Sequence, residues 1–162
     1  MGSFKSRGWQ IDNNDSILVI GEKGSLDLGS KLAKCLPSGT QVGLVGDLGA
    51  GKTTIVRGIL GALAPSEDVS SPSYVLCHEY STGDGIVEHW DLYRLTELPE
   101  ELLFIQPNVL LRLIEWPNKI EGYQRELSLI LEIKNSSGSD RLISFSGAEA
   151  STVLQSLTAF ES

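Results

Sequence analysis

Residues 46–53, GDLGAGKT, combine three glycines with one lysine and one threonine in a single short stretch. They match the pattern G-x-x-x-x-G-K-[ST] at every fixed position, between an apolar run and a helical pattern. Glycines allow a backbone to curl until successive N–H groups point at one phosphate, and the following helix adds the positive end of its dipole. The stretch therefore predicts binding of a nucleoside di- or triphosphate, with Lys52 at the β- and γ-phosphates and the Thr53 hydroxyl on Mg²⁺. The residues expected around the phosphates are Asp47, Leu48, Gly49, Ala50, Gly51, Lys52, Thr53 and Thr54.

Hydrolysis of a nucleotide also needs a carboxylate near the metal and a group that orients the attacking water. Two acids end apolar runs: Glu115 follows VLLRLI, and Asp91 follows IVEHW. Acids at the carboxyl ends of sheet strands are well placed for a metal or a water molecule, although such acids can also simply cap a turn. Both interpretations stay open at this point. His78 and His89 lack the spacing of a metal pair, and we expect them to face solvent or to be hydrogen-bonded.

The nucleobase is predicted to be adenine. Guanine is read by the pattern N-K-x-D, whereas residues 118–121 are NKIE, in which Glu121 replaces the aspartate. No D-x-x-G switch lies between the phosphate loop and this stretch. The expected nucleotide is therefore ATP.

The elements that must position these groups follow from local patterns. Strands are predicted at residues 16–20, 41–45, 74–80, 85–95 and 109–116, and a hairpin within 126–146. Helices are predicted at 25–36, 52–63, 98–105 and 147–160. This order predicts an α/β fold: a compact single P-loop mononucleotide-binding domain over residues 1–162, with a central mostly parallel sheet, helices on both faces and a C-terminal β-hairpin. The polar residues 1–16 are expected to form a flexible arm.

Composition limits the classes of partner. The chain has 13 Lys and Arg against 21 Asp and Glu, a net charge of −8, which argues against independent binding to DNA or RNA. Its apolar runs fall short of the roughly 20 residues of a membrane span, and its start lacks the apolar core of a secretory signal. Cys35 and Cys77 are expected to be reduced thiols, and the expected location is the cytoplasm.

Four stretches in this order, GDLGAGKTT, SPSY, HWDLYRL and IEWP, resemble the bacterial TsaE family, whose older name is YjeE. The resemblance covers roughly residues 20–120. It implies a small ATPase that is slow alone and uses ATP and Mg²⁺ in tRNA N6-threonylcarbamoyladenosine modification at A37. The implied partners are a TsaD-like threonylcarbamoyl transferase and its TsaB-like paralogue, which ATP hydrolysis would reset between cycles. Contact with tRNA is expected to be only indirect, and no DNA or membrane partner is expected.

The same resemblance assigns roles to individual residues. It implies that Lys52, Asp91 and Glu115 are catalytic, with Asp91 acting in hydrolysis. It implies that Thr53 and Glu115 serve the metal site.

The resemblance also reaches three aromatic or hydroxyl positions. Trp116 is expected to shape the nucleotide pocket, and Ser73 stands where the family has Thr in S-P-T, near the metal. Trp90 replaces the usual Phe before Asp91. The segment at residues 106–109, QPNV, is shorter than the family pattern and bears on partner docking.

Two other functions share the phosphate loop. A small-molecule kinase would need an Arg-rich lid, whereas Arg94 and Arg112 are isolated in the sequence. A binding module would hold the nucleotide as a structural ligand without turning it over.

Overall fold

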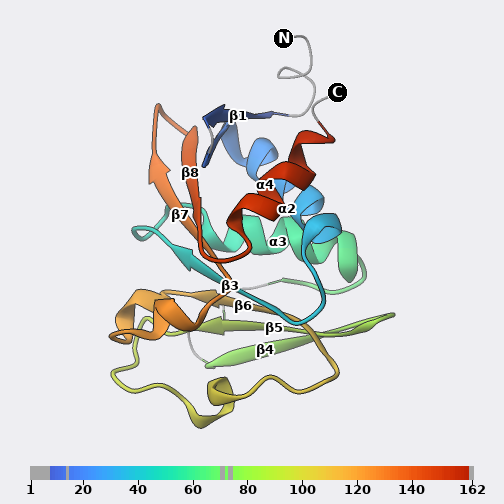
Figure 1. Cartoon of the computed structure of the whole chain (residues 1–162), viewed down its shortest axis with the longest axis vertical. Helices are drawn as coiled ribbons and strands as arrows, with labels where there is room; N and C mark the ends of the chain where they lie inside the picture. The colour runs from blue at the N-terminus through green and yellow to red at the C-terminus, as the bar shows by residue number, and fades with distance from the viewer. Residues whose placement is uncertain (1–7, 14, 70–71, 73–74, 161–162) are drawn as a thin grey trace.

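The computed structural model describes residues 8–13, 15–69, 72 and 75–160. Within these residues, eight strands form one sheet in the order β1-β2-β8-β7-β3-β6-β5-β4 (Figure 1). The strands are β1 (Trp9–Asn13), β2 (Ser16–Val19), β3 (Thr40–Val45), β4 (Cys77–Thr82), β5 (Gly85–Asp91), β6 (Val109–Glu115), β7 (Leu129–Asn135) and β8 (Arg141–Ser146). The α-helices are α2 (Gly21–Cys35), α3 (Lys52–Leu63) and α4 (Ala150–Thr158), and the 3₁₀ helices are η1 (Glu100–Leu103), η2 (Pro117–Lys119) and η3 (Tyr123–Glu126). None of the helices in the described ranges is long and apolar enough to cross a membrane.

The prediction of a mostly parallel sheet is wrong. Only the central strands run parallel, where β3 lies between β7 and β6 and β6 continues to β5. The pairs β1–β2, β2–β8, β7–β8 and β4–β5 are antiparallel. The reason is that β2 does not pair with β3 across α2 but joins the far edge of the C-terminal hairpin, while β4 turns back tightly on β5. The hairpin of β7 and β8 itself is confirmed.

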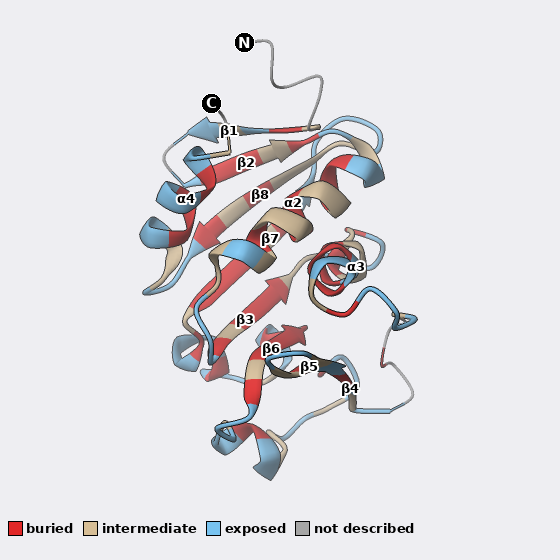
Figure 2. Cartoon of the chain, turned by 90° about the vertical axis from the view of Figure 1, so that its right-hand side faces the viewer, coloured by how far each residue is buried: buried red, intermediate tan, exposed pale blue. Residues whose placement is uncertain are grey.

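The α-helices lie together on one face of the sheet (Figure 2). One buried apolar cluster contains Leu32 of α2, Ile59 of α3 and Val153 of α4. The apolar cluster of the opposite face is closed by Leu102 of η1 and Tyr123 of η3. The expectation of helices on both faces is therefore corrected, because this second face carries 3₁₀ turns in place of α-helices. Pro99 and Pro117 stand at the starts of η1 and η2, where proline is tolerated, and Pro107 follows the end of η1 by four residues.

Part of the segment predicted to be a flexible arm belongs to the sheet. Trp9 begins β1 and is fully buried, and its indole N–H donates to Asp27 Oδ2 of α2 at 2.7 Å. A buried tryptophan whose N–H has a partner anchors an edge strand well.

Helices α2 and α3 cross with their backbones in contact. A Cβ on Gly29 would lie 2.5 Å from the carbonyl oxygen of Ile55, and one on Gly58 would collide with the carbonyl of Leu26. Only glycine at both positions permits this approach. The crossing fixes α3, which begins directly after the phosphate loop.

A buried ion pair ties β5 to β6 on the face opposite the α-helices. Arg112 Nε donates to Glu88 Oε1 at 2.6 Å, and the indole N–H of Trp90 donates to the same oxygen at 3.0 Å. The Arg112 guanidinium also donates to the carbonyls of Glu101 and Phe104, at 3.2 and 2.8 Å. This network holds the segment around η1 against the strands that lead to Asp91 and Glu115.

Candidate active site

The phosphate loop joins the end of β3 to the start of α3. Gly49 and Gly51 have φ values of 78° and 107°, a region that side-chain-bearing residues rarely adopt. The loop curls around its own lysine, because Lys52 Nζ donates to the carbonyls of Gly46 and Asp47, at 2.7 and 2.9 Å. The backbone geometry therefore agrees with a cradle for phosphates.

Lys52 is almost completely buried beside three carboxylates. Burial lowers the pKa of its ammonium group, while Glu115, Asp91 and Asp47 act in the opposite direction. Its Nζ also lies 4.2 Å from the centre of the Trp116 ring, a cation–π contact. The ammonium group of the lysine is thus enclosed between the loop carbonyls and the indole.

Trp116 is held in an unusual backbone conformation. With φ at 61°, it is the one non-glycine residue with positive φ in the described part of the chain. Its N–H donates to the carbonyl of Leu44 at 3.1 Å, and its ring lies 4.8 Å from that of Tyr93. Such strain is of order 1 kcal/mol or more and persists where the surroundings impose it. The turn after β6 places the indole over the phosphate loop.

The two predicted acids are direct neighbours. Asp91 ends β5 and pairs with Glu115, which ends β6, in the parallel ladder. Their exposed fractions are only 8% and 3%. The Thr53 hydroxyl lies 3.1 and 3.0 Å from the two carboxylate oxygens of Glu115, whereas the Tyr93 N–H donates to Asp91 at 2.9 Å. Both acids therefore meet the start of α3, as expected from their places at the carboxyl ends of parallel strands.

One cavity of about 280 Å³ collects most of the predicted residues. Its lining comprises Leu48, Gly49, Gly51, Lys52, Thr53, Thr54, Asp91, Glu115 and Trp116. Ser73, predicted near the metal, lies outside the described residues. The cavity beside the loop is thus lined by the lysine, the threonine hydroxyl, the two carboxylates and the indole.

Residues 21–143 match the family model described as Threonylcarbamoyl adenosine biosynthesis protein TsaE. The chain belongs to the TsaE family. It is 38% identical over 122 residues to the tRNA threonylcarbamoyladenosine biosynthesis protein TsaE of Haemophilus influenzae, a match that covers 69% of this chain and 77% of that protein. A protein of the same name from Nostoc sp. is 41% identical over 93 residues, 57% of this chain and 56% of its own length.

A solved structure supports the fold. The crystal structure of YdiB from Bacillus subtilis matches with a TM-score of 0.74 at 22% identity, over 91% of this chain and 95% of that chain. The family assignment therefore rests on sequence, and the arrangement of strands and helices agrees with a solved structure.

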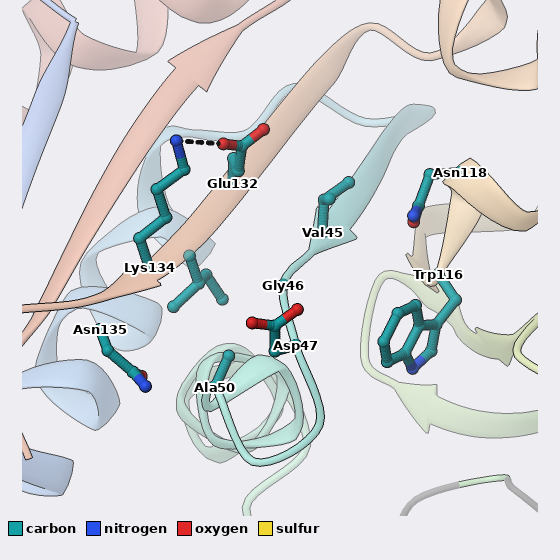
Figure 3. Close-up of a pocket in the computed structure, with 10 residues that line it drawn as sticks. Val45, Gly46, Asp47, Ala50, Trp116, Asn118, Glu132, Lys134 and Asn135 are labelled. Atoms are coloured by element: carbon teal, nitrogen blue, oxygen red, sulfur yellow. Dashed lines mark ion pairs between the residues drawn. The ribbon is translucent and has the colours of Figure 1, made fainter.

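A second cavity of about 320 Å³ lies on the other side of the TsaE phosphate loop (Figure 3). Two residues predicted at the phosphates, Asp47 and Ala50, line this cavity and not the first. Trp116 lines both, and Figure 3 shows its indole across the space from Lys134 and Asn135 of β7. The indole therefore borders both cavities.

Two site residues were missed by the sequence analysis. His89 is fully buried, and its Nε2 lies 2.5 Å from Glu115 Oε2. The available signal was its place two residues before Asp91, since alternate residues of a strand share one face. Arg141 of β8 donates from Nε to the carbonyl of Ala50 at 3.0 Å and so braces the phosphate loop. Nothing in the local sequence indicates this second contact.

The donor set suits Mg²⁺ bound together with a nucleotide. In the described residues, no group of three or more His, Cys, Asp and Glu side chains is gathered as a metal cage. Mg²⁺ generally takes one or two carboxylates together with substrate phosphates and water. The oxygens of Thr53 and Glu115, already 3.0 Å apart, fit that mode of binding, and Asp91 adjoins them.

Proposed function

We propose that this TsaE-family chain hydrolyses ATP to ADP and phosphate with Mg²⁺, in support of tRNA N6-threonylcarbamoyladenosine modification at A37. The observation that carries the proposal is the meeting of Lys52, Thr53, Asp91 and Glu115 at one cavity. A nucleotide site without hydrolysis would not require two nearly buried acids beside the lysine.

Each residue has a physical role in this proposal. Loop N–H groups and Lys52 bind the phosphates, and the lysine exchanges its contacts with the Gly46 and Asp47 carbonyls for phosphate oxygens. Thr53 and Glu115 hold Mg²⁺, which when bound neutralises charge on the phosphates. Asp91 accepts a hydrogen bond from the attacking water and keeps it in line with the terminal phosphate. Trp116 covers the lysine and limits access of other water.

The proposed partners are the threonylcarbamoyl transferase and its paralogue, and hydrolysis resets their complex between cycles. The net charge of −8 supports indirect involvement of tRNA, because an acidic chain is repelled by its phosphates. Hydrolysis by the chain alone is slow in this proposal and rises in the complex. The proposed location is the cytoplasm.

Reconstitution tests this function. Purified chain, ATP, Mg²⁺, the transferase pair and tRNA should give many rounds of modified adenosine per complex. Omission of the chain, or its replacement by the Lys52→Ala variant, should stop the reaction after about one round. Unchanged ATP turnover on addition of the transferase pair would count against the proposal. Transfer of the γ-phosphate to a metabolite would instead support a kinase.

A further inference from the structure

His89 lies beneath the two acids on the helix-covered face of the sheet. In the ladder between β5 and β6, His89 pairs with Leu113 and Asp91 pairs with Glu115. Alternate strand residues share a face, so His89, Asp91 and Glu115 all project toward α3. His89 therefore reaches Glu115 diagonally, from the buried side of the cavity.

The two oxygens of Glu115 have different partners. His89 Nε2 lies 2.5 Å from Oε2, whereas the Thr53 hydroxyl lies within 3.1 Å of both oxygens. An ionised carboxylate only accepts hydrogen bonds, so the imidazole must donate from Nε2. If Thr53 turns its oxygen toward a metal, His89 is the contact that still fixes the carboxylate.

The other nitrogen of the ring supports this assignment. His89 Nδ1 is buried without a hydrogen-bond partner among the described residues. Burying an N–H donor without a partner is costlier than burying a bare acceptor nitrogen. The favoured form therefore carries its proton on Nε2, aimed at Glu115. The side chain has no contact with solvent that would explain a histidine here on grounds of solubility.

We propose that His89 is a positioning residue that holds the Glu115 carboxylate in the orientation required at the Mg²⁺ site. This inference rests on the proposed function of Glu115. Partners of this kind orient metal-binding side chains, and their loss typically costs about 10- to 100-fold in metal affinity or activity.

Paired substitutions test the proposal through metal dependence. His89→Leu removes the donor at similar size, and His89→Gln keeps an N–H donor near the position of Nε2. The measurement is the Mg²⁺ concentration that half-saturates ADP binding, followed by calorimetry, with ADP binding in EDTA as the internal reference. His89→Leu should raise that Mg²⁺ concentration about tenfold or more and leave binding in EDTA unchanged. His89→Gln should stay within about threefold of the original protein.

His78→Leu is the matched control. His78 is the direct cross-strand neighbour of His89 on β4 and is half-buried, and its ring contacts Tyr80. This substitution should leave the Mg²⁺ dependence unchanged. An unshifted Mg²⁺ dependence in a folded His89→Leu variant, or equal impairment of His89→Gln and His89→Leu, would overturn the proposal.

A second measurement works even if His89→Leu does not fold. The chain contains two histidines, so ¹⁵N spectra of their rings can be assigned. We expect His89 to carry its proton on Nε2, protected from exchange, and to change in Glu115→Ala while His78 does not. A proton found on Nδ1 alone would exclude the hydrogen bond to Glu115. Failure of the original protein to bind Mg²⁺ with ADP would contradict the proposed function, independently of His89.

Discussion

Lys52 is outnumbered by acids in its own cavity. Asp47, Asp91 and Glu115 all act on its pKa, so the protein supplies more negative than positive charge beside the loop. A triphosphate would add further negative charge. We therefore expect tight binding of ATP to require a divalent cation, and we expect the buried acids to make that requirement stronger than the loop alone would.

Replacement of Glu115 should separate hydrolysis from binding. Glu115→Gln keeps the size and an oxygen for the Thr53 hydroxyl but removes the negative charge. We expect phosphate release to fall about 100-fold, by analogy with the loss of a group that holds the metal. ADP binding in EDTA should persist or strengthen, because one repulsive charge is gone.

Phosphate release and calorimetry report these two properties of Glu115→Gln. Asp84→Asn, at the exposed turn between β4 and β5, is the control and should behave like the original protein. Normal turnover in Glu115→Gln would remove this acid from the site.

The cysteine on β4 should be unreactive in the folded chain. Burial, followed by the nearby carboxylates of Glu88 and Glu79, raises the pKa of Cys77 to about 12. At pH 8 about one thiol in 10⁴ is then ionised, and only the thiolate reacts readily. We expect negligible alkylation by iodoacetamide at pH 8, measured by mass spectrometry, and rapid alkylation in urea.

The same shift has a consequence for stability. A folded-state pKa above the unfolded value of about 8.5 favours the protonated thiol in the folded chain. The contribution of the Cys77 thiol to the free energy of unfolding is therefore complete below about pH 8.5, and it is lost as the pH rises toward 12.

In the alkylation experiment, fast labelling of Cys77 in the folded chain at pH 8 would contradict its assigned burial.

At the scale of elements, the Arg112–Glu88 pair connects β5 and β6 to the segment around η1. Arg112→Met leaves Glu88 as a buried charge with its strongest partner removed. We expect the free energy of unfolding to fall by about 3–5 kcal/mol. The double variant Glu88→Gln with Arg112→Met should recover most of that loss. Urea denaturation measures both changes.

Arg125→Met is the matched control for this network, because Arg125 is exposed on η3. Its effect should lie within about 0.5 kcal/mol. A loss below about 1 kcal/mol in Arg112→Met would show that the buried pair does not stabilise the sheet.

Most of the local elements could be predicted from the sequence, but their arrangement could not. The helix expected at residues 52–63 matches α3 residue for residue. The glycine-rich turn marks its first residue, and its periodic apolar face continues to its last. The direction of β2 depends on pairing with β8, more than 100 residues away in the sequence, and local patterns do not contain that contact. The strand β1 was missed because it is short and mostly polar, with Trp9 buried and Ile11 partly buried.

At the scale of the whole molecule, nucleotide binding should stabilise the fold. At a ligand concentration 100 times Kd, the expected gain is about 2.7 kcal/mol. For a chain of this length that corresponds to a rise in Tm of about 5–11 °C. ADP or ATP with Mg²⁺ should produce this rise at concentrations where GTP has a smaller effect, as measured by thermal unfolding.

Lys52→Ala should fold but show no nucleotide-dependent rise in Tm. An equal or larger rise with GTP would overturn the prediction of adenine. A rise in Lys52→Ala equal to that of the original protein would place the nucleotide away from the loop.

The candidate site could be predicted further than the sheet around it. Spacing identified Lys52 and Thr53. The ends of two apolar runs made Asp91 and Glu115 candidates, and the family resemblance assigned their roles; all four residues line one cavity. His89 required the register of β5 against β6, and Arg141 required the return of β8 to the loop. Functional residues that belong to a local motif can be predicted from the sequence. Supporting residues such as His89 and Arg141 can be found only once the pairing of distant strands is known.

The glycine contact between α2 and α3 makes these two helices a mechanical unit. The first turn of α3 lines the candidate nucleotide cavity, and six residues after Lys52, Gly58 lies against α2 without intervening side chains. No side chains at the crossing can change rotamer to absorb a displacement of that first turn, so we expect α2 to move with α3. Near the first residue of α2, the backbone of Gly24 contacts that of Gly8, which directly precedes β1. We therefore expect a displacement of the phosphate loop to reach the sheet edge farthest from the acids.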